Sequence, residues 1–106
     1  MIARVWSAQT TPTQAPAYVE HLQSQVLPAL RKIDGFGGVL LLQRPTNEAA
    51  EILVITFWQS LDSLRGFAPA DLEEAVVAAE AVPLLTQFDR RVRHYEVVVN
   101  EDMPRA

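Results

Sequence analysis

Residues 52–58, ILVITFW, constrain the fold of this chain more than any other stretch. Six of these seven residues are apolar, Thr56 is the exception, and β-branched and aromatic types predominate. This composition at this length favours a strand over a buried helix. A strand that is apolar on both faces has to be covered on both faces. Because a chain of 106 residues has few elements with which to do so, the pattern predicts that a second subunit covers one face.

Length and composition describe one globular domain. The chain is near the common domain size, with 49% hydrophobic and 21% charged residues, which is ordinary for a globular protein. We expect the domain to span residues 1–100, and residues 101–106 to form a flexible polar tail. A net charge of −4 argues against nucleic acid or an anionic membrane surface as a partner.

Several chemistries are excluded by what the sequence lacks. Cysteine is absent, which rules out a disulfide framework, thiol chemistry and a Cys–zinc site. No signal peptide or transmembrane run is visible, so we expect a cytoplasmic protein. The two histidines, His21 and His94, do not have the spacing of a metal site on a helix or strand. No metal is therefore expected.

Apolar periodicity and turn residues predict six main elements in the order strand, helix, strand, strand, helix, strand. Pro28 should kink the first helix, and Gly35 should close it. Gly37 and Gly38 indicate a bulge or a close backbone approach. Pro69 separates a short helix that begins at residue 61 from the next one. The predicted strands are residues 2–8, 36–44, 52–58 and 91–100, and the two main helices are residues 17–33 and 72–80.

This order is the split βαβ arrangement of the ferredoxin-like α+β class. It predicts a four-stranded antiparallel sheet in the order 4-1-3-2, with both helices on one face. The other face would expose the apolar residues of the second and third strands, and such a face on a monomer aggregates or binds a partner. A second copy packed sheet to sheet covers it by a two-fold contact. We therefore predict a homodimer through the sheet face.

A series of short motifs follows along the chain: MIARVW at the start, Tyr18 and Leu22, GFGG at residues 35–38, FWQSLDSLRGFA at residues 57–68, and FDRRVRHYEVV at residues 88–98. In this order and spacing they resemble the antibiotic biosynthesis monooxygenase (ABM)-like domains of the dimeric α+β barrel superfamily. The matching features are a Trp-x-Ser junction before an aromatic-containing helix, and a His-Tyr-Glu-Val strand. The resemblance covers residues 1–99.

The resemblance implies a dimeric barrel and several possible activities. The superfamily includes cofactor-independent oxygenases of aromatic polyketides, haem-degrading oxygenases, quinol oxygenases and proteins without known catalysis. The haem-degrading branch uses an Asn, a Trp and a His, and Trp58 resembles its tryptophan. Residues 5–7 contain no Asn and residues 76–79 contain no His. The resemblance therefore argues against haem degradation and implies no cofactor.

His94 is the candidate catalytic residue, because it is the histidine that lies on a predicted strand. Alternation along that strand places it on the same face as Glu96, roughly 6–7 Å away. A neutral imidazole can take a proton from a phenolic or anthrone-type carbon acid, with Glu96 or Arg4 to orient it. The resulting carbanion would react with dioxygen without a cofactor, which is what the resemblance implies. The alternative is a hydrogen-bonded histidine of the core or of the dimer interface.

Three aromatic residues, Trp6, Tyr18 and Trp58, are candidate walls of a pocket for an aromatic ligand. The alternative is that they pack in the core. The order 4-1-3-2 pairs the first and last strands, so Arg4 or Trp6 should lie across from His94. By the same order, Trp58 should lie nearer to the start of the first strand than to His94.

Arg4 shares a strand face with Trp6 and is expected to be at least half-buried. A buried arginine needs a carboxylate partner, and Glu96 is the predicted one, either in a salt bridge or as part of an anion site. His21, beside Glu20 on the first helix, is expected to face solvent.

Two functions remain open at the level of sequence. The first is a small cofactor-independent monooxygenase that acts on an aromatic or quinone-forming small molecule, with His94 as the base. The second is a non-catalytic dimeric barrel that binds a small ligand. The fold itself does not decide between them, because this scaffold hosts many activities.

Overall fold

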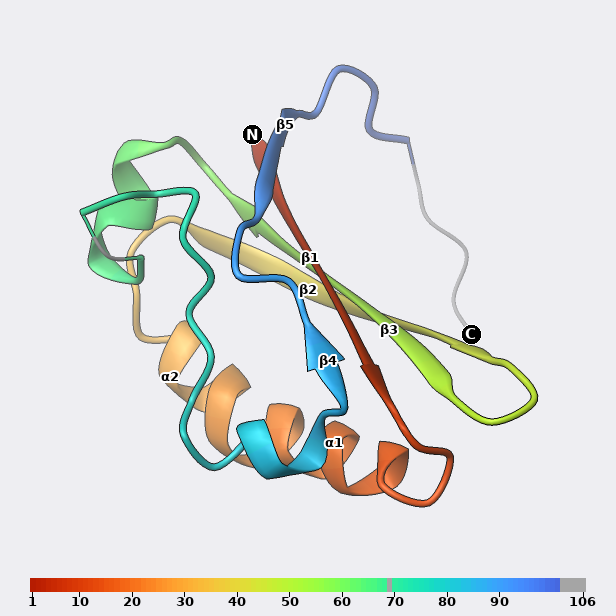
Figure 1. Ribbon diagram of the computed structural model, residues 1–106. Helices are drawn as coiled ribbons and strands as arrows, with labels where there is room; N and C mark the ends of the chain where they lie inside the picture. The colour runs from red at the N-terminus through yellow and green to blue at the C-terminus, as the bar shows by residue number, and fades with distance from the viewer. Residues whose placement is uncertain (69, 102–106) are drawn as a thin grey trace.

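An antiparallel sheet with one long helical segment packed against one of its faces forms the protein (Figure 1). The computed structural model describes residues 1–68 and 70–101. The predicted break at Pro69 and residues 102–106 of the predicted tail lie outside the described residues.

The sheet has the predicted strand order. Its strands run in the order β2-β3-β1-β4, with β5 also paired to β1; counted from the other edge, and with β4 and β5 as two pieces of one strand, this is the order 4-1-3-2. All pairs are antiparallel. The ferredoxin-like α+β class is thereby confirmed. The strands are β1 (Ile2–Thr10), β2 (Phe36–Pro45), β3 (Ala50–Trp58), β4 (Gln87–Phe88) and β5 (Arg93–Glu96).

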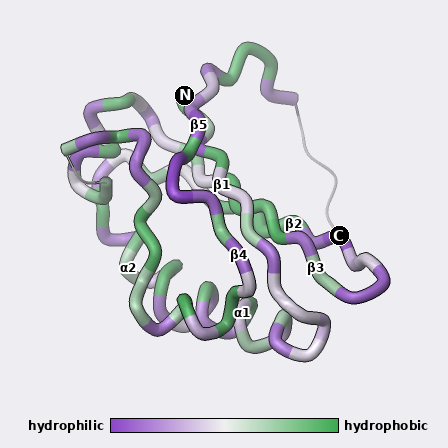
Figure 2. Tube along the Cα trace, in the orientation of Figure 1, coloured by the Kyte–Doolittle hydropathy of each residue, from purple (hydrophilic) through white to green (hydrophobic). Residues whose placement is uncertain are grey.

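The strand β3 has one fully buried face and one half-buried face. Every second residue from Ala50 to Trp58 is buried, and the residues between them are partly exposed. We call the buried side of the sheet the covered face and the other side the open face. Hydrophobic residues lie along the middle of β2 and β3, and hydrophilic residues at the turn that joins them (Figure 2). The sheet is thus covered on one side by its own chain and bare on the other.

The covering helix is one continuous segment with a widened turn in the middle. It consists of α1 (Ala15–His21), the π-helix η1 (Leu22–Val26) and α2 (Leu27–Leu30). In the π turn the Leu27 N–H donates to the Leu22 carbonyl, five residues back. Pro28 follows at once and has no N–H to donate, so the regular ladder is interrupted here. The first helix is therefore irregular next to Pro28, where the sequence predicts a kink.

Two glycines have the roles that the sequence indicated. Gly35 follows the helical segment with φ of 89°, a conformation that L side chains rarely adopt, and an added Cβ would lie 2.4 Å from the Ser63 Cβ. Gly38 has φ of 135°, and the β2–β3 register shifts between Phe36 and Gly38. The predicted bulge is therefore present.

The predicted helix at residues 72–80 does not form. The chain there consists of turns and irregular backbone with one isolated bridge between Glu74 and Arg91. We call residues 72–81 the covering segment because they run beside β4 and β5 and contribute Val77 and Ala81 to the core (teal in Figure 1). In its first half the backbone bonds to distant groups: the Ala75 N–H donates to the Arg90 carbonyl at 2.9 Å, and the Val92 N–H donates to the Glu73 carbonyl at 2.7 Å. These tertiary bonds outweigh the helical propensity of the local sequence. The short helix at residue 61 does form, as the 3₁₀-helix η2 (Asp62–Gly66).

The predicted last strand, residues 91–100, forms only as β5, and β4, a short strand that the sequence did not predict, precedes it. Between β4 and β5 the backbone turns to other partners, since the Trp6 indole N–H donates to the Asp89 carbonyl at 2.8 Å and Val92 bonds to the covering segment. Pairing ends where β1 begins: Glu96 lies opposite Ile2, and the Val97 N–H donates to the Met1 carbonyl. Without a partner strand beyond that point, the following valines stay exposed.

Two apolar clusters fill the space between the covered face and the chain segments over it. The first cluster contains Tyr18, Ile52, Val54 and Ala81, with Trp6 packed against it. The second cluster contains Leu30, Trp58 and Leu64, with the rings of Phe36 and Phe67 against it. In the described part of the chain, no helix has the length and apolar composition needed to cross a bilayer.

We predict that Arg4→Met destabilises the protein by roughly 3 kcal/mol. The Arg4 guanidinium donates to the Leu72 and Glu74 carbonyls at 2.5 and 2.8 Å, and hydrogen bonds from charged groups contribute about 1.5–3 kcal/mol each. The free energy of unfolding from urea titrations at one fixed protein concentration measures this loss. The control Arg65→Met removes an exposed pair with Asp62 and should change stability by less than about 0.5 kcal/mol. Equal losses for the two variants would contradict the prediction.

Candidate functional site

Three polar side chains form a row across the covered face, between the two apolar clusters. The strand register places Arg4 of β1 opposite Thr56 of β3 and opposite His94 of β5. Arg4 is only 4% exposed and Thr56 only 7%. We call these three residues the polar row. The predicted position of Arg4 across from His94 is confirmed, and so is that of Trp58, which lies opposite Ile2.

A cavity lies beside this row, between the helical segment, the sheet and the covering segment. Its volume is about 70 Å³. Arg4 and Thr56 form part of its wall, and most of the remaining wall is aliphatic or aromatic. The three aromatic rings that line it are those of Trp6, Tyr18 and Phe67. This combination of a mainly apolar wall and a few polar groups is typical of small-molecule sites.

Two of the three predicted pocket aromatics line the cavity. The Trp6 and Tyr18 rings are 6.3 Å apart between centroids. Trp58 does not line it: the side chain is fully buried in the second cluster, with its ring 5.4 Å from that of Phe36 and 5.7 Å from that of Phe67. Its indole N–H donates to the Thr56 hydroxyl at 2.9 Å. The expectation that Trp58 is a pocket wall is therefore corrected to a core residue.

His94 is held by Arg4. The Arg4 Nη1 lies 2.9 Å from the His94 Nε2, and because a guanidinium can only donate, Nε2 is the acceptor and the ring proton sits on Nδ1. Burial and then the charge of Arg4 lower the pKa of His94, and the charge of Glu73 opposes them. His94 is thus a neutral ring whose Nε2 lone pair is engaged, and it is not among the residues that line the cavity. That it acts as the base stays a prediction.

The orienting partner of His94 is Arg4 and not Glu96. Glu96 is exposed at the end of β5, opposite Ile2. Within the described chain no ion pair involves Glu96 or Arg4. The predicted Arg4–Glu96 salt bridge is therefore wrong. Neutral backbone carbonyls and an imidazole take the place of the carboxylate.

His21 lines the cavity, contrary to the expectation that it faces solvent. It is half-buried near the end of α1, and its ring centroid lies 6.0 Å from that of Tyr18. The signal was present in the sequence, since residues 18, 21 and 22 share one helical face. Burial raises the pKa of Tyr18 to about 12, so its phenol is neutral at physiological pH. Among the cavity-lining residues, His21 is the one imidazole.

The cavity is small for a binding site. Sites for drug-sized ligands are typically about 300–1,000 Å³, so a volume of about 70 Å³ suits at most a single ring. The covering segment forms one wall of the cavity, and residues 76–80 make few backbone hydrogen bonds. Within the described chain, their only one joins the Ala78 carbonyl to the Ala81 N–H. No three His, Asp or Glu side chains of residues 1–68 and 70–101 gather in a way that suits a metal ion.

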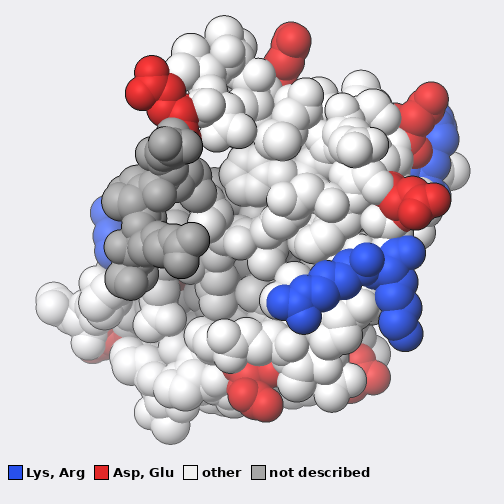
Figure 3. Space-filling view, turned by 180° about the vertical axis from the view of Figure 1, so that it is seen from behind, with Lys and Arg blue, Asp and Glu red and all other residues white. Residues whose placement is uncertain are grey.

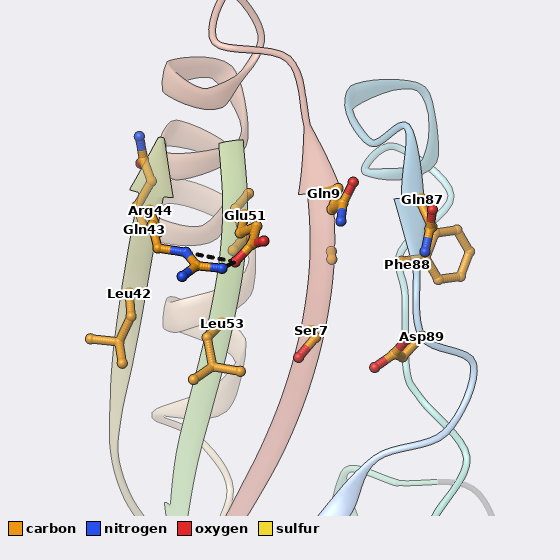
Figure 4. Close-up of a pocket in the computed structure, with 12 residues that line it drawn as sticks. Ser7, Gln9, Leu42, Gln43, Arg44, Glu51, Leu53, Gln87, Phe88 and Asp89 are labelled. Carbon is orange, nitrogen blue, oxygen red and sulfur yellow. Dashed lines mark hydrogen bonds and ion pairs between the residues drawn. The ribbon is translucent and has the colours of Figure 1, made fainter. Parts of the chain in front are cut away.

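A second hollow, of about 350 Å³, lies on the open face. Figure 4 shows Leu42 and Leu53 along β2 and β3, next to the ion pair between Arg44 and Glu51, whose N–O distance is 2.6 Å. This hollow is larger, but it is an open surface on the face for which the sequence predicts a partner subunit. The cavity on the covered face is the better candidate for chemistry, because its wall combines a buried cation and an imidazole with apolar groups.

The fold and the cavity define a small ferredoxin-like α+β protein with a candidate ligand site between sheet and helix. The sequence profile of the family described as "Antibiotic biosynthesis monooxygenase" matches residues 1–80. The chain therefore belongs to the antibiotic biosynthesis monooxygenase family. No curated protein matches the sequence.

Solved structures agree on the fold. The chain is similar to a heme-degrader, MhuD, from Mycobacterium tuberculosis with two hemes bound (24% identity, TM-score 0.60, 96% of this chain and 100% of that chain covered). It is also similar to a candidate antibiotic biosynthesis monooxygenase from Bacillus cereus (14% identity, TM-score 0.68, 99% of this chain and 98% of that chain covered). A third similar structure is a candidate antibiotic biosynthesis monooxygenase from Deinococcus radiodurans (18% identity, TM-score 0.64, 98% of this chain and 99% of that chain covered). At these identities the likeness establishes the fold alone. A cavity of about 70 Å³ does not accommodate a porphyrin.

We predict that His94→Gln makes the stability of the protein less sensitive to acid. Folding lowers the pKa of His94, so the unfolded chain binds that proton more readily and native stability falls as pH drops through about 6.5. A glutamine can still accept from Arg4 but does not titrate. Thermal unfolding midpoints at about pH 7.5 and pH 5.5 should therefore fall further for the wild type than for the variant. Equal decreases would show that the Arg4–His94 contact does not govern this titration.

Proposed function

We propose that this protein is an oxidoreductase of the cofactor-independent oxygenase type, acting on a small aromatic, quinone-forming molecule. One observation supports the proposal most: a cavity that is lined by Trp6, Tyr18 and Phe67 and that also presents His21 and the buried Arg4. Flat rings suit an aromatic substrate. Membership of the antibiotic biosynthesis monooxygenase family raises the expectation of oxygen chemistry.

The proposed reaction needs dioxygen and a substrate that can lose a proton. A methylene carbon or a ring hydroxyl of the substrate is deprotonated. A carbon of the resulting anion that still carries a hydrogen then forms a C–O bond with dioxygen, which gives a hydroperoxide after protonation. One oxygen atom ends as the new carbonyl, and the other leaves as water with the two hydrogens that the substrate loses. The protein has to take up the first proton, exclude bulk water and hold the anion.

His21 is the better placed of the two histidines to accept that proton. An imidazole accepts protons near neutral pH, and His21 lines the cavity. His94 lies behind Arg4, which occupies its Nε2. Because a general base must come within hydrogen-bond reach of the proton it removes, we propose His21 as the base and His94 as the residue that positions Arg4.

Substrates larger than one ring require the covering segment to move. Residues 76–80 are the part of the wall with the fewest backbone hydrogen bonds, whereas residues 72–75 are tied to Arg4 and to residues 90–92. We propose that residues 76–80 shift outward when such a substrate enters. Wall segments with few bonds are the ones that open at low cost.

We also propose that the protein is a homodimer through the open face. The strand register places Val5, Leu40, Leu53, Ile55 and Phe57 on this face, and Leu42 and Tyr95 there are 45% and 51% exposed. Seen from behind the view of Figure 1, most of the surface is uncharged and the charged side chains form separate groups (Figure 3). A continuous apolar sheet face is self-complementary under a two-fold axis.

The two histidines separate the roles proposed for them in an oxygen-uptake assay. With a dihydroquinone and an anthrone as substrates, His21→Gln should lower kcat by about 10²-fold or more, while His94→Gln should retain more of the activity. Quinone formation is followed by absorbance together with oxygen consumption.

The reverse order of effects would assign the base to His94, as the strand pattern first indicated. Arg65→Met, a change in an exposed ion pair whose residues do not line the cavity, serves as the control and should leave kcat unchanged. If the wild type consumes no oxygen with either substrate class, the non-catalytic ligand-binding barrel is the better description.

We predict that Leu53→Asp converts a dimer into a monomer. The substitution would bury a charge in the centre of the open face, which opposes association. Sedimentation or light scattering should give twice the chain mass for the wild type and a single chain mass for the variant. The control is Leu61→Asp, which introduces the same charge directly before η2. Leu61 is as exposed as Leu42 of the open face, and this variant should stay dimeric. A monomeric wild type would contradict the proposed dimer.

A further inference from the structure

The charge of Arg4 is not balanced by any carboxylate in the described chain. Its three hydrogen-bond partners are the Leu72 carbonyl, the Glu74 carbonyl and the His94 imidazole, all of them neutral. The ion pairs of the described residues belong to other arginines. Burial of a cation without an anion is costly, so the cavity beside Arg4 carries a net positive charge.

Arg4 also has more hydrogen-bond donors than its partners use. A guanidinium has five N–H groups. Nη1 uses its two on the Leu72 carbonyl and on His94, and Nη2 uses one on the Glu74 carbonyl. One N–H of Nη2 and the N–H of Nε have no partner among the described residues, and Arg4 is part of the cavity wall.

Thr56 adds a second donor at the same place. It lies opposite Arg4 in the strand register and lines the cavity. Its hydroxyl oxygen accepts from the Trp58 indole at 2.9 Å, which leaves the hydroxyl hydrogen free to donate. A ligand oxygen placed between the two residues would therefore meet donors from both.

The remaining side chains of the cavity wall suit an aromatic ring. Trp6, Tyr18 and Phe67 line the cavity, and the Phe67 ring lies 5.7 Å from the Arg4 Cζ. From these observations we infer that the cavity binds its aromatic ligand as a phenolate, with the ring among these side chains and the charged oxygen on Arg4 and Thr56. The inference deepens the proposed function, because an ionised ring is the form that reacts with dioxygen.

The inference is tested with 4-nitrophenol, whose phenol and phenolate absorb at different wavelengths. Bound to the wild type, the phenolate should be favoured over the phenol by about tenfold or more relative to free solution, since a nearby cation shifts a carboxyl or phenol by one to three pKa units. Arg4→Met should abolish this preference, and Thr56→Val should reduce it. Arg65→Met should leave it unchanged.

Neutral ligands keep the test decisive if Arg4→Met folds poorly. In the wild type alone, the 4-nitrophenolate anion should bind about tenfold more tightly than 4-nitroanisole, its uncharged methyl ether. Where Arg4→Met does fold, 4-nitroanisole should bind it as well as the wild type, which shows that the cavity is intact. Benzoate serves as a second anion, and tighter binding of benzoate than of the phenolate would reject the phenolate in favour of a carboxylate.

Each remaining result also decides the question. Equal binding of anion and ether, no binding of either, or an unchanged preference in Arg4→Met would overturn the inference. A clear preference for the phenolate without oxygen uptake from any aromatic substrate would support the anion site and reject the proposed oxygenase. The two proposals therefore fail separately.

Discussion

The burial of one guanidinium, that of Arg4, is the constraint on which the architecture of the covered face depends. A cation that is 4% exposed must find acceptors within the protein, because the loss of water is otherwise too costly. Arg4 finds them in two carbonyls of the covering segment and in His94. Inside a regular helix these carbonyls would already accept hydrogen bonds from N–H groups of the same helix. The same demand therefore keeps residues 72–75 out of a regular helix, fixes the tautomer of His94 and places a positive charge at the cavity wall.

The two faces of the sheet differ in composition and in role. The covered face holds the polar row between two apolar clusters, and each cluster has its own large aromatic residues. The open face has no such row: it is apolar along the middle of β2 and β3 and carries the Arg44–Glu51 ion pair near their joining turn. Since neighbouring residues of a strand point to opposite sides, one apolar run such as residues 52–58 serves both tasks at once. A change at an even-numbered position of β3 acts on the covered face, where Val54 and Thr56 line the cavity, and one at an odd-numbered position acts on the open face.

Much of the fold followed from the sequence, because strand pairing depends on patterns that are local. The apolar run of β3, the glycines of β2 and the proline of the helical segment each produced the structure that was predicted. The helix at residues 72–80 failed because its apolar spacing fits a helix as well as an extended segment. The decisive bonds come from Arg4 and Arg90, far away in sequence. His21 was assigned to solvent from its neighbour Glu20, although Tyr18, three residues earlier, marks the face that it shares.

The distribution of bonds along the covering segment reconciles a small cavity with a site for chemistry. Residues 72–75 are held by Arg4 and by the chain near β5, whereas residues 76–80 contact the cavity through side chains and make little backbone contact. The wall can thus widen at residues 76–80 without breaking the bonds that place Arg4. Under the proposed function, a cation fixed in the wall keeps its position while residues 76–80 shift for rings of different size. Such an arrangement provides a preorganised charge, which is the property that stabilises an anion most effectively.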